Sequence, residues 1–349
     1  MRRRDFLGRI CFAGMTCALP NAWVLAANSP TKNRTEFSPS TEELDQTRLW
    51  LLANPFNGSN RGERRKRMAV IQSACDKLEP ETYAEYVESW ESSPKTADAL
   101  EEKHPALYYL RKATAHAFED IRKTKVKEGI AIWHIYNMGY VFKTGEKCFG
   151  IDVHARDAEK LADDLDFLLI THEHTDHWTR GLLEAMIAKG KPVITRWFEG
   201  STIVNEPKEL AFGRTKVRIE IGDHHPHSTN NMLMFEVDCG PKSGGFNIYH
   251  SGDGFNLQKM KPRKPVDVFI PHVSVGLNIE KTITKLDPDL TCLSHVLELG
   301  HSPLPPHAWR WSFDYAFSTV KNLPENRACV PTWGEKWKAE GRSRKAIEQ

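Results

Sequence analysis

Hydrophobic spacing divides the chain into a helical first part and a β-rich second part. Ser40-x-x-Glu43 forms a capping box, which predicts a helix that runs to about Ala53 and ends at Asn54-Pro55. Apolar residues then recur at helical intervals: Met68, Ile71, Cys75 and Leu78, and again Leu107, Leu110, Ala117 and Ile121. We therefore predict a helical segment of three to five short helices over residues 40–125.

From Gly129 onward the pattern changes to short β-rich runs separated by turns. The predicted strands are 130–142, 148–153, 167–170, 192–195, 217–221, 232–237, 246–249 and 266–270, the first two paired across Thr144-Gly145. Helices are expected near 156–164, 179–188 and 307–320. Strands mixed with helices over this length indicate a layered α/β domain, which we assign to residues 126–349.

The N-terminus has the features of a targeting signal. Paired arginines in Arg3-Arg4-Asp5-Phe6-Leu7 precede a moderately apolar run, and Val24-Leu25-Ala26 suits a signal peptidase. The pattern resembles the bacterial twin-arginine signal, whose pathway exports folded proteins. We expect residues 1–27 to be a signal peptide, 28–39 a linker, and the mature protein to be periplasmic or otherwise exported. No later stretch approaches the roughly 20 apolar residues that a membrane span needs.

Charge argues against nucleic acid as a partner. The chain has 48 Lys and Arg against 46 Asp and Glu, a net charge of +2. Residues 1–27 carry four arginines and one aspartate, so their net +3 leaves about −1 on the remainder. A nearly neutral body lacks the broad basic surface that phosphate backbones require.

The cysteines do not form a disulfide framework. Five of the seven lie outside the expected signal peptide, widely scattered and without a CxxC pair: Cys75, Cys148, Cys239, Cys292 and Cys329. We expect them to be small buried residues, and a single bridge remains open.

The histidines indicate a metal site. Twelve of the fifteen lie between His154 and His307, and the densest group is His172-Glu173-His174-Thr175-Asp176-His177. This group directly follows the apolar run Leu168–Ile170, so we expect the group to lie at the end of a buried strand, where its position is fixed. Imidazole and carboxylate donors at this spacing suit a borderline cation such as zinc.

The spacing His172-x-His174-x-Asp176-His177 resembles the signature of the metallo-β-lactamase superfamily, and similarity in motif order extends from about residue 129 to 302. The resemblance implies an α/β fold, the αββα four-layer sandwich, preceded here by the helical segment. It also implies two divalent transition-metal ions, zinc first, with manganese or iron compatible. The implied metal ligands are His172, His174, Asp176, His177, His227, Asp253 and His295.

Two of these predicted ligands have alternative candidates. His225 competes with His227 for the third histidine, and His301 competes with His295 for the last ligand. Residues that are not ligands in this region, Glu298 among them, would contact substrate or support the ligands. His272 follows a strand but comes early in the motif order, so we expect it to be a satisfied polar residue.

The implied activity is hydrolysis by a hydroxide held between two metals, with Asp176 orienting the water and sharing its proton. The bond would be an ester, lactone or phosphodiester in a small-molecule or lipid substrate. Asp152 and the Ser251-Gly252-Asp253 step resemble the lactonase-like and phospholipase D-like branch of the superfamily. The alternative is a metal-binding or sensor protein of the same fold without hydrolytic activity. The oligomeric state has no signal in the sequence.

Overall fold

The computed structural model describes residues 38–56, 61–224, 227–301, 310–324 and 326–339. The predicted signal peptide, most of the predicted linker, and His225 lie outside these residues. Residues 36–349 belong to one compact unit, so the helical segment and the β-rich part pack together. In the described part of the chain, no helix is both long and apolar enough to cross a bilayer.

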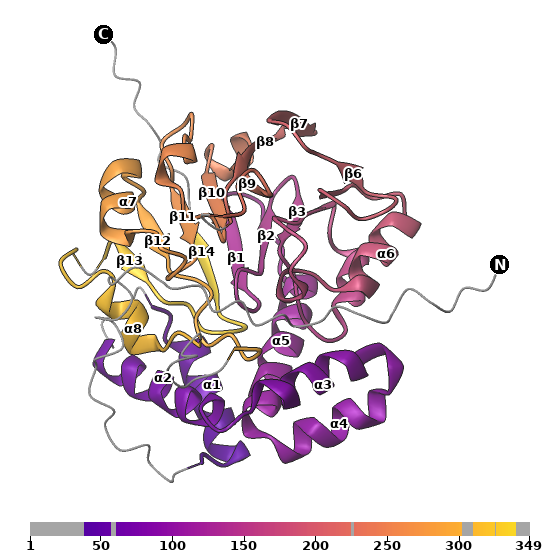
Figure 1. The fold of residues 1–349 in the computed structure, drawn as a ribbon, viewed down its shortest axis with the longest axis vertical. Coiled ribbons are helices and arrows are strands. Elements are labelled where there is room, and N and C mark those ends of the chain that lie inside the picture. Colours follow the sequence, from indigo (N-terminus) through magenta and orange to yellow (C-terminus); the bar gives the residue numbers. More distant parts are fainter. Residues whose placement is uncertain (1–37, 57–60, 225–226, 302–309, 325, 340–349) are drawn as a thin grey trace. The chain divides into compact units, whose positions relative to one another are not determined.

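Five helices make up the first part, as predicted: α1 (Thr41–Ala53), α2 (Arg61–Cys75), α3 (Pro80–Ser92), α4 (Pro94–Lys103) and α5 (Pro105–Lys123). Ser40 caps α1 by accepting a hydrogen bond from the Glu43 amide at 3.1 Å. Helices α3, α4 and α5 each begin with proline, whose missing N–H costs nothing at that position. Figure 1 shows the five helices, indigo to magenta, gathered at one end of the sheets.

Within the described residues, the second part consists of two seven-stranded sheets. The first has the order β14-β1-β2-β3-β4-β5-β6 and the second β13-β12-β11-β10-β9-β8-β7. The first-sheet strands are β1 (Ile130–His134), β2 (Tyr140–Thr144), β3 (Cys148–Ile151), β4 (Phe167–Leu169), β5 (Val193–Thr195), β6 (Thr202–Ile203) and β14 (Lys336–Ala339). The second-sheet strands are β7 (Lys208–Phe212), β8 (Thr215–Gly222), β9 (Met232–Asp238), β10 (Asn247–Gly252), β11 (Val268–Pro271), β12 (Leu290–Cys292) and β13 (Ala328–Cys329).

The sheets pack face to face because alternate side chains point to opposite faces of each strand. In β1, Ile132 faces a core that also holds Phe235 and Ile248 of the second sheet, whereas Trp133 belongs to the core shared with the helices. Outside the sheets lie α5, α6 (Arg180–Ala188), α7 (Ile279–Leu286) and α8 (Phe313–Ser318). The predicted αββα sandwich and the helical segment that precedes it are therefore confirmed.

Some predicted elements differ from the structure. The predicted strand 130–142 is two strands, because Asn137 adopts a left-handed conformation (φ 49°) and turns the chain. The predicted helix 156–164 is a 3₁₀ helix at Ala158–Asp163, and the predicted helix 307–320 appears as α8 within the described residues. The five predicted buried cysteines are all buried and unbridged.

Candidate metal centre

The histidine-rich loop begins where β4 ends, and a buried aspartate fixes it there. Asp152, itself in a left-handed conformation (φ 50°), accepts hydrogen bonds from the Thr171 amide at 2.8 Å and the Thr171 hydroxyl at 2.7 Å. A 3₁₀ turn at Thr175–His177 then folds the loop back on itself. The loop therefore presents several side chains to one place.

A first group of donors consists of His172, His174, His224 and Asp253, whose ligand atoms lie within 4.8 Å of one another. The Nε2 atoms of His172 and His224 lie 3.7 and 3.5 Å from Oδ2 of Asp253. Asp253 arrives at the end of β10 after Gly252, where a Cβ atom would lie 2.8 Å from the Thr171 side chain. Only glycine allows the strand to pass so close to the histidine loop.

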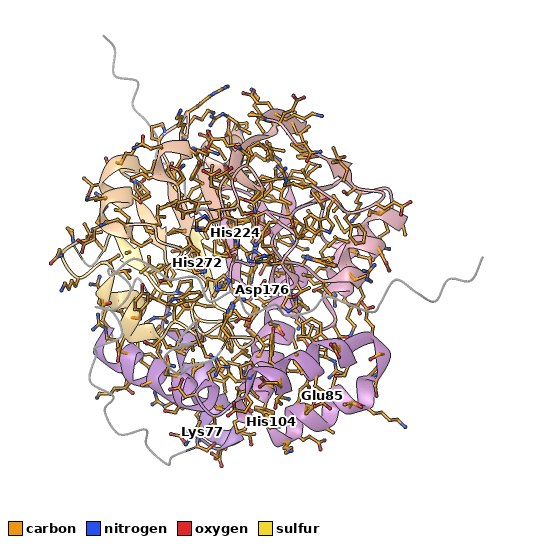
Figure 2. All side chains as sticks on the ribbon, in the orientation of Figure 1. Lys77, Glu85, His104, Asp176, His224 and His272 are labelled. Carbon is orange, nitrogen blue, oxygen red and sulfur yellow. The ribbon has the colours of Figure 1, made fainter. Side chains whose placement is uncertain are left out.

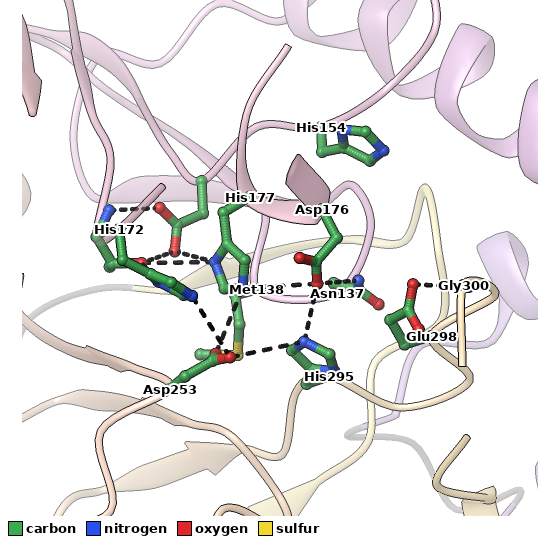
Figure 3. Close-up of polar contacts among 12 residues, drawn as sticks. Asn137, Met138, His154, His172, Asp176, His177, Asp253, His295, Glu298 and Gly300 are labelled. Atoms are coloured by element: carbon green, nitrogen blue, oxygen red, sulfur yellow. Dashed lines mark hydrogen bonds and ion pairs between the residues drawn. The ribbon is translucent and has the colours of Figure 1, made fainter. Parts of the chain in front are cut away.

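A second group consists of Asp176, His177 and His295. His295 Nε2 lies 3.0 Å from Oδ2 of Asp176, and His177 Nε2 lies 3.6 Å from the same oxygen. His177 Nε2 also lies 3.4 Å from Oδ1 of Asp253, and His295 Nε2 lies 3.9 Å from its Oδ2. Asp253 therefore stands between the two groups, as Figure 3 shows.

Several donor atoms of the two groups are not paired with one another and are suited to binding metal ions. His172 Nε2, His177 Nε2, His224 Nε2 and Asp253 Oδ1 are buried and lack a hydrogen-bond partner within the described residues. Burying so many unpaired polar atoms is costly unless something compensates them. Nitrogen and carboxylate donors are the ligands that zinc and similar cations take. The residues present fit two such cations.

Hydrogen bonds behind the site fix the histidine tautomers. His177 Nδ1 donates to Asp152 at 2.9 Å, which leaves Nε2 without a proton when the ring is neutral. The Thr171 hydroxyl donates to Asp152, so at 2.9 Å it accepts from His172 Nδ1. One buried carboxylate thereby leaves the Nε2 lone pairs of both rings free for cations that these residues would hold.

Asn137 supports the second group. Its Nδ2 donates to Asp176 at 3.1 Å, and its carbonyl accepts from the His295 amide at 3.2 Å. The turn that divides β1 from β2 thus brings the Asn137 side chain to Asp176 and the Asn137 backbone carbonyl to the His295 amide; Figure 3 shows Asn137 beside Asp176. Asn137 was not predicted from the sequence, because its role depends on a left-handed conformation and on contacts with Asp176 and His295, which lie far along the chain.

The charges balance around His177. Burial alone would raise the pKa of Asp176 and of Asp253, but His177 and the other neighbouring histidines hold both pKa values well below the ordinary range. Burial would lower the pKa of His177, and three carboxylates outweigh it, so that its pKa lies well above the ordinary value. A cation at this nitrogen would compete with a proton for His177, so metal binding is expected to depend on pH.

The structure brings together six of the seven predicted ligands but not His227. His227 is exposed, whereas His224 lies in the first group. β8 ends at Gly222, and the chain is held only one residue later, where Asp223 contacts Lys259 and accepts from the Asn230 amide at 2.8 Å. The loop therefore delivers its first histidine to the site, three positions before the predicted one.

The remaining predicted residues lie beside the second group. Glu298 forms an ion pair with His301 Nδ1 and accepts from Tyr136 at 3.3 Å. The His301 ring lies 6.2 Å from the His295 ring. Burial alone would lower the pKa of His301, but the ion pair with Glu298 raises it. The pair therefore adds a charged group at the edge of the site.

The helical segment reaches this loop through one buried arginine. Arg310 donates from Nε to the Glu298 carbonyl at 3.1 Å and from Nη2 to the Leu299 carbonyl at 2.8 Å. The same guanidinium contacts the carbonyls of Cys75 and Leu78 at the end of α2. The loop that follows His295 is thereby tied to the helices.

Part of the chain is similar to a known protein family. Residues 133–290 match the family model described as a beta-lactamase superfamily domain. A comparison with curated proteins finds no match.

Similar solved structures include the metallo hydrolase Igni18 from Ignicoccus hospitalis, with 16% identity over 60% of this chain and 98% of that chain and a TM-score of 0.47. A possible metal-dependent hydrolase from Veillonella parvula has 15% identity over 61% and 100% of the two chains and a TM-score of 0.47. The metallo-beta-lactamase fold protein YhfI from Bacillus subtilis has 14% identity over 61% and 100%, with a TM-score of 0.46. Residues 133–290 are thus similar to a beta-lactamase superfamily domain, and the two packed sheets with helices outside them have the layout of the metallo-β-lactamase fold.

Proposed function

We propose that the protein is a metal-dependent hydrolase that cleaves an ester, lactone or phosphodiester bond. The observation that carries the proposal is the position of Asp253 between two groups of donors, in which the buried Nε2 atoms of His172, His177 and His224 have no hydrogen-bond partner among the described residues. A purely structural polar cluster would pair its own donors and acceptors. This cluster instead spaces nitrogens 3.4 to 3.9 Å from one carboxylate, which leaves room for cations between them.

Two bound cations would supply a water of lowered pKa and would stabilise negative charge on the substrate oxygens. Asp176 is the central acid more open to solvent, with 18% of its side chain exposed against 6% for Asp253. Asn137 and His295 hold its Oδ2, which fixes the carboxylate plane. Asp176 is therefore placed to orient water and to take its proton.

The substrate is proposed to carry an apolar part beside the bond that breaks. Trp311 lies at the edge of the second group, with its ring 5.5 Å from His295 and 5.9 Å from His301. Tyr83 of α3 contacts Tyr136, whose hydroxyl reaches the Glu298 loop. Tyr83 and Tyr136 are buried, whereas Trp311 is partly exposed beside the second group, which favours an acyl chain or another apolar substituent there.

A hydrolase screen at neutral pH tests this proposal. The panel contains short-chain esters, lactones and a phosphodiester, each assayed with metal-loaded protein, with chelator, and after metal is restored. We expect turnover on at least one class, abolished by chelator and recovered with metal, and strongly reduced in Asp176→Asn. Chelator-insensitive turnover would contradict the proposal. Stoichiometric metal without turnover on any class would favour the metal-binding or sensor alternative.

Export is part of the proposal and has a separate test. The proposed twin-arginine pathway would carry the folded chain after its metal has been acquired. Replacing Arg3 and Arg4 with lysine should retain the protein in the cytoplasm, as judged by fractionation. Unchanged accumulation outside the cytoplasm would refute this route without affecting the hydrolase proposal.

A further inference from the structure

His272 lies at the metal centre but differs from every ligand in its hydrogen bonding. It directly follows β11 and is only 1% exposed. Its ring stacks on His295, with centroids 4.1 Å apart and an interplanar angle of 25°. One of its ring nitrogens lies within 4.8 Å of both a carboxylate oxygen of Asp253 and a ring nitrogen of His295. Figure 2 labels His272, Asp176 and His224 in the β-rich part of the molecule.

The backbone fixes the tautomer of His272. The Ser274 amide donates to His272 Nδ1 at 2.9 Å, and a backbone N–H is always the donor. Nδ1 therefore carries the lone pair, and in the neutral ring the proton sits on Nε2. His172 and His177 have the opposite arrangement, because their Nδ1 atoms face acceptor oxygens and their Nε2 atoms are left for cations.

His250 shows what a fully satisfied histidine of the same tautomer looks like. Its Nδ1 accepts from the Gly252 amide at 3.1 Å, and its Nε2 donates to the Met138 carbonyl at 2.9 Å. His272 repeats the first contact, but its Nε2 has no corresponding acceptor within the described residues. His272 Nε2 is not among the fully buried unpaired atoms of the described residues, so this donor is open to a partner that enters the site.

We propose that His272 is a substrate-binding residue whose Nε2–H donates a hydrogen bond to a negatively charged oxygen of the substrate. An Nε2 that carries a proton offers no lone pair to a cation, so the residue complements the metal site rather than extending it. A donor fixed in a buried site acts without reorganisation on the oxygen where charge develops. The inference rests on the proposed function, because it assigns a role toward the oxyanion of that reaction.

Two readouts test the role of His272 without any assumption about the substrate. Proton–nitrogen NMR spectra of metal-loaded protein should show His272 protonated at Nε2, the signal being assigned by its loss in His272→Gln. Inorganic phosphate, a tetrahedral oxyanion, should shift that signal. His272→Phe preserves the ring that stacks on His295 but removes the donor, and should weaken phosphate binding about tenfold with an unchanged metal content. His272→Gln retains an N–H donor and should bind phosphate with intermediate affinity.

The outcomes separate this inference from the hydrolase proposal. Loss of one metal equivalent in His272→Phe and His272→Gln, or a metal-bound Nε2 signal, would overturn it in favour of a ligand role. Unchanged phosphate affinity in both variants would overturn it in favour of a packing role. If a substrate is found, His272→Phe should lower kcat by about 10²- to 10³-fold with a smaller effect on KM. Absence of turnover in the wild type would count against the hydrolase proposal alone.

Discussion

The two donor groups at the metal centre differ in how firmly the protein holds them. In the second group, His177 and His295 are almost fully buried. Asp152 accepts a hydrogen bond from His177, and Asn137 donates one to Asp176. In the first group, His174 is exposed, and His224 is only partly buried. Two histidines of the first group are therefore more open to solvent, whereas both histidines of the second group are buried. A site of this kind should bind one cation tightly and the other more weakly.

The largest effect should come from the residue that the groups share. Asp253→Ala removes a carboxylate that lies within 4 Å of nitrogens from both groups. We expect the loss of both cations and a fall in activity of well over ~100-fold, beyond the usual effect of a residue that only supports a ligand. Elemental analysis of the dialysed variant measures the metal. Retention of one full equivalent would show that the groups are independent and that Asp253 does not connect them.

Asp152 should produce the next largest effect. Asp152→Asn keeps the shape of the side chain but presents an amide where His177 and Thr171 need an acceptor. Ligand orientation should suffer, and metal affinity should fall about 10- to 100-fold. Asp166→Asn is the matched control, because Asp166 accepts from the Cys148 amide at 2.8 Å away from the centre. Equal losses of metal affinity in the two variants would argue for a general folding defect.

The connection between the helices and the second group predicts a smaller effect. Arg310→Met removes the guanidinium that holds the Glu298 and Leu299 carbonyls, so the loop after His295 should become less ordered. The affinity for the more tightly bound cation should then fall several-fold. Arg64→Met is the control. Arg64 is also buried between the helices and the sheets, where it pairs with Glu335 at 2.5 Å.

Both arginine substitutions leave buried acceptors unpaired and should lower the free energy of unfolding by roughly 1–3 kcal/mol or more. Only Arg310→Met should also weaken metal binding, as measured by competition with a chelating dye. If Arg64→Met weakens it equally, the effect of Arg310 comes from stability rather than from the position of the loop.

The smallest expected effect concerns the pKa of His301. In the metal-free protein the ion pair with Glu298 raises this pKa against the opposing effect of burial. The stability that the pair contributes is therefore fully present below the ordinary histidine value of about 6.5 and is lost as the pH rises through the folded-state pKa. Glu298→Gln should lower the pKa of His301 in an NMR titration. An unchanged pKa would show that the pair is not charged.

The sequence predicted most of what depends on local spacing. The loop His172–His177 follows a short apolar strand and carries its donors at alternate positions, so its chemistry was visible without a structure. The αββα layers followed from the resemblance and from the alternation of short strands. The edge strands β7 and β14 were missed, because the first is largely exposed and the second is defined by its pairing with β1.

The parts of the site that sequence did not predict depend on contacts between distant segments. His224, rather than His227, lies in the first donor group, and its loop is held by a contact between Asp223 and Lys259, 36 residues apart. Asn137 acts through a left-handed turn, and His272 acquires its distinct tautomer from one backbone amide. Motif order alone placed His272 outside the ligand set, whereas its position in the centre required the folded chain.

Metal analysis of the purified and reconstituted protein tests the central claim most directly. After loading with zinc, manganese or iron and removal of free metal, the protein should retain about two cations per chain. Stepwise exposure to chelator should remove them in two phases, and His174→Ala should lack only the weakly held one. Failure to retain any cation, or hydrolytic activity that persists in fully metal-free protein, would contradict the account.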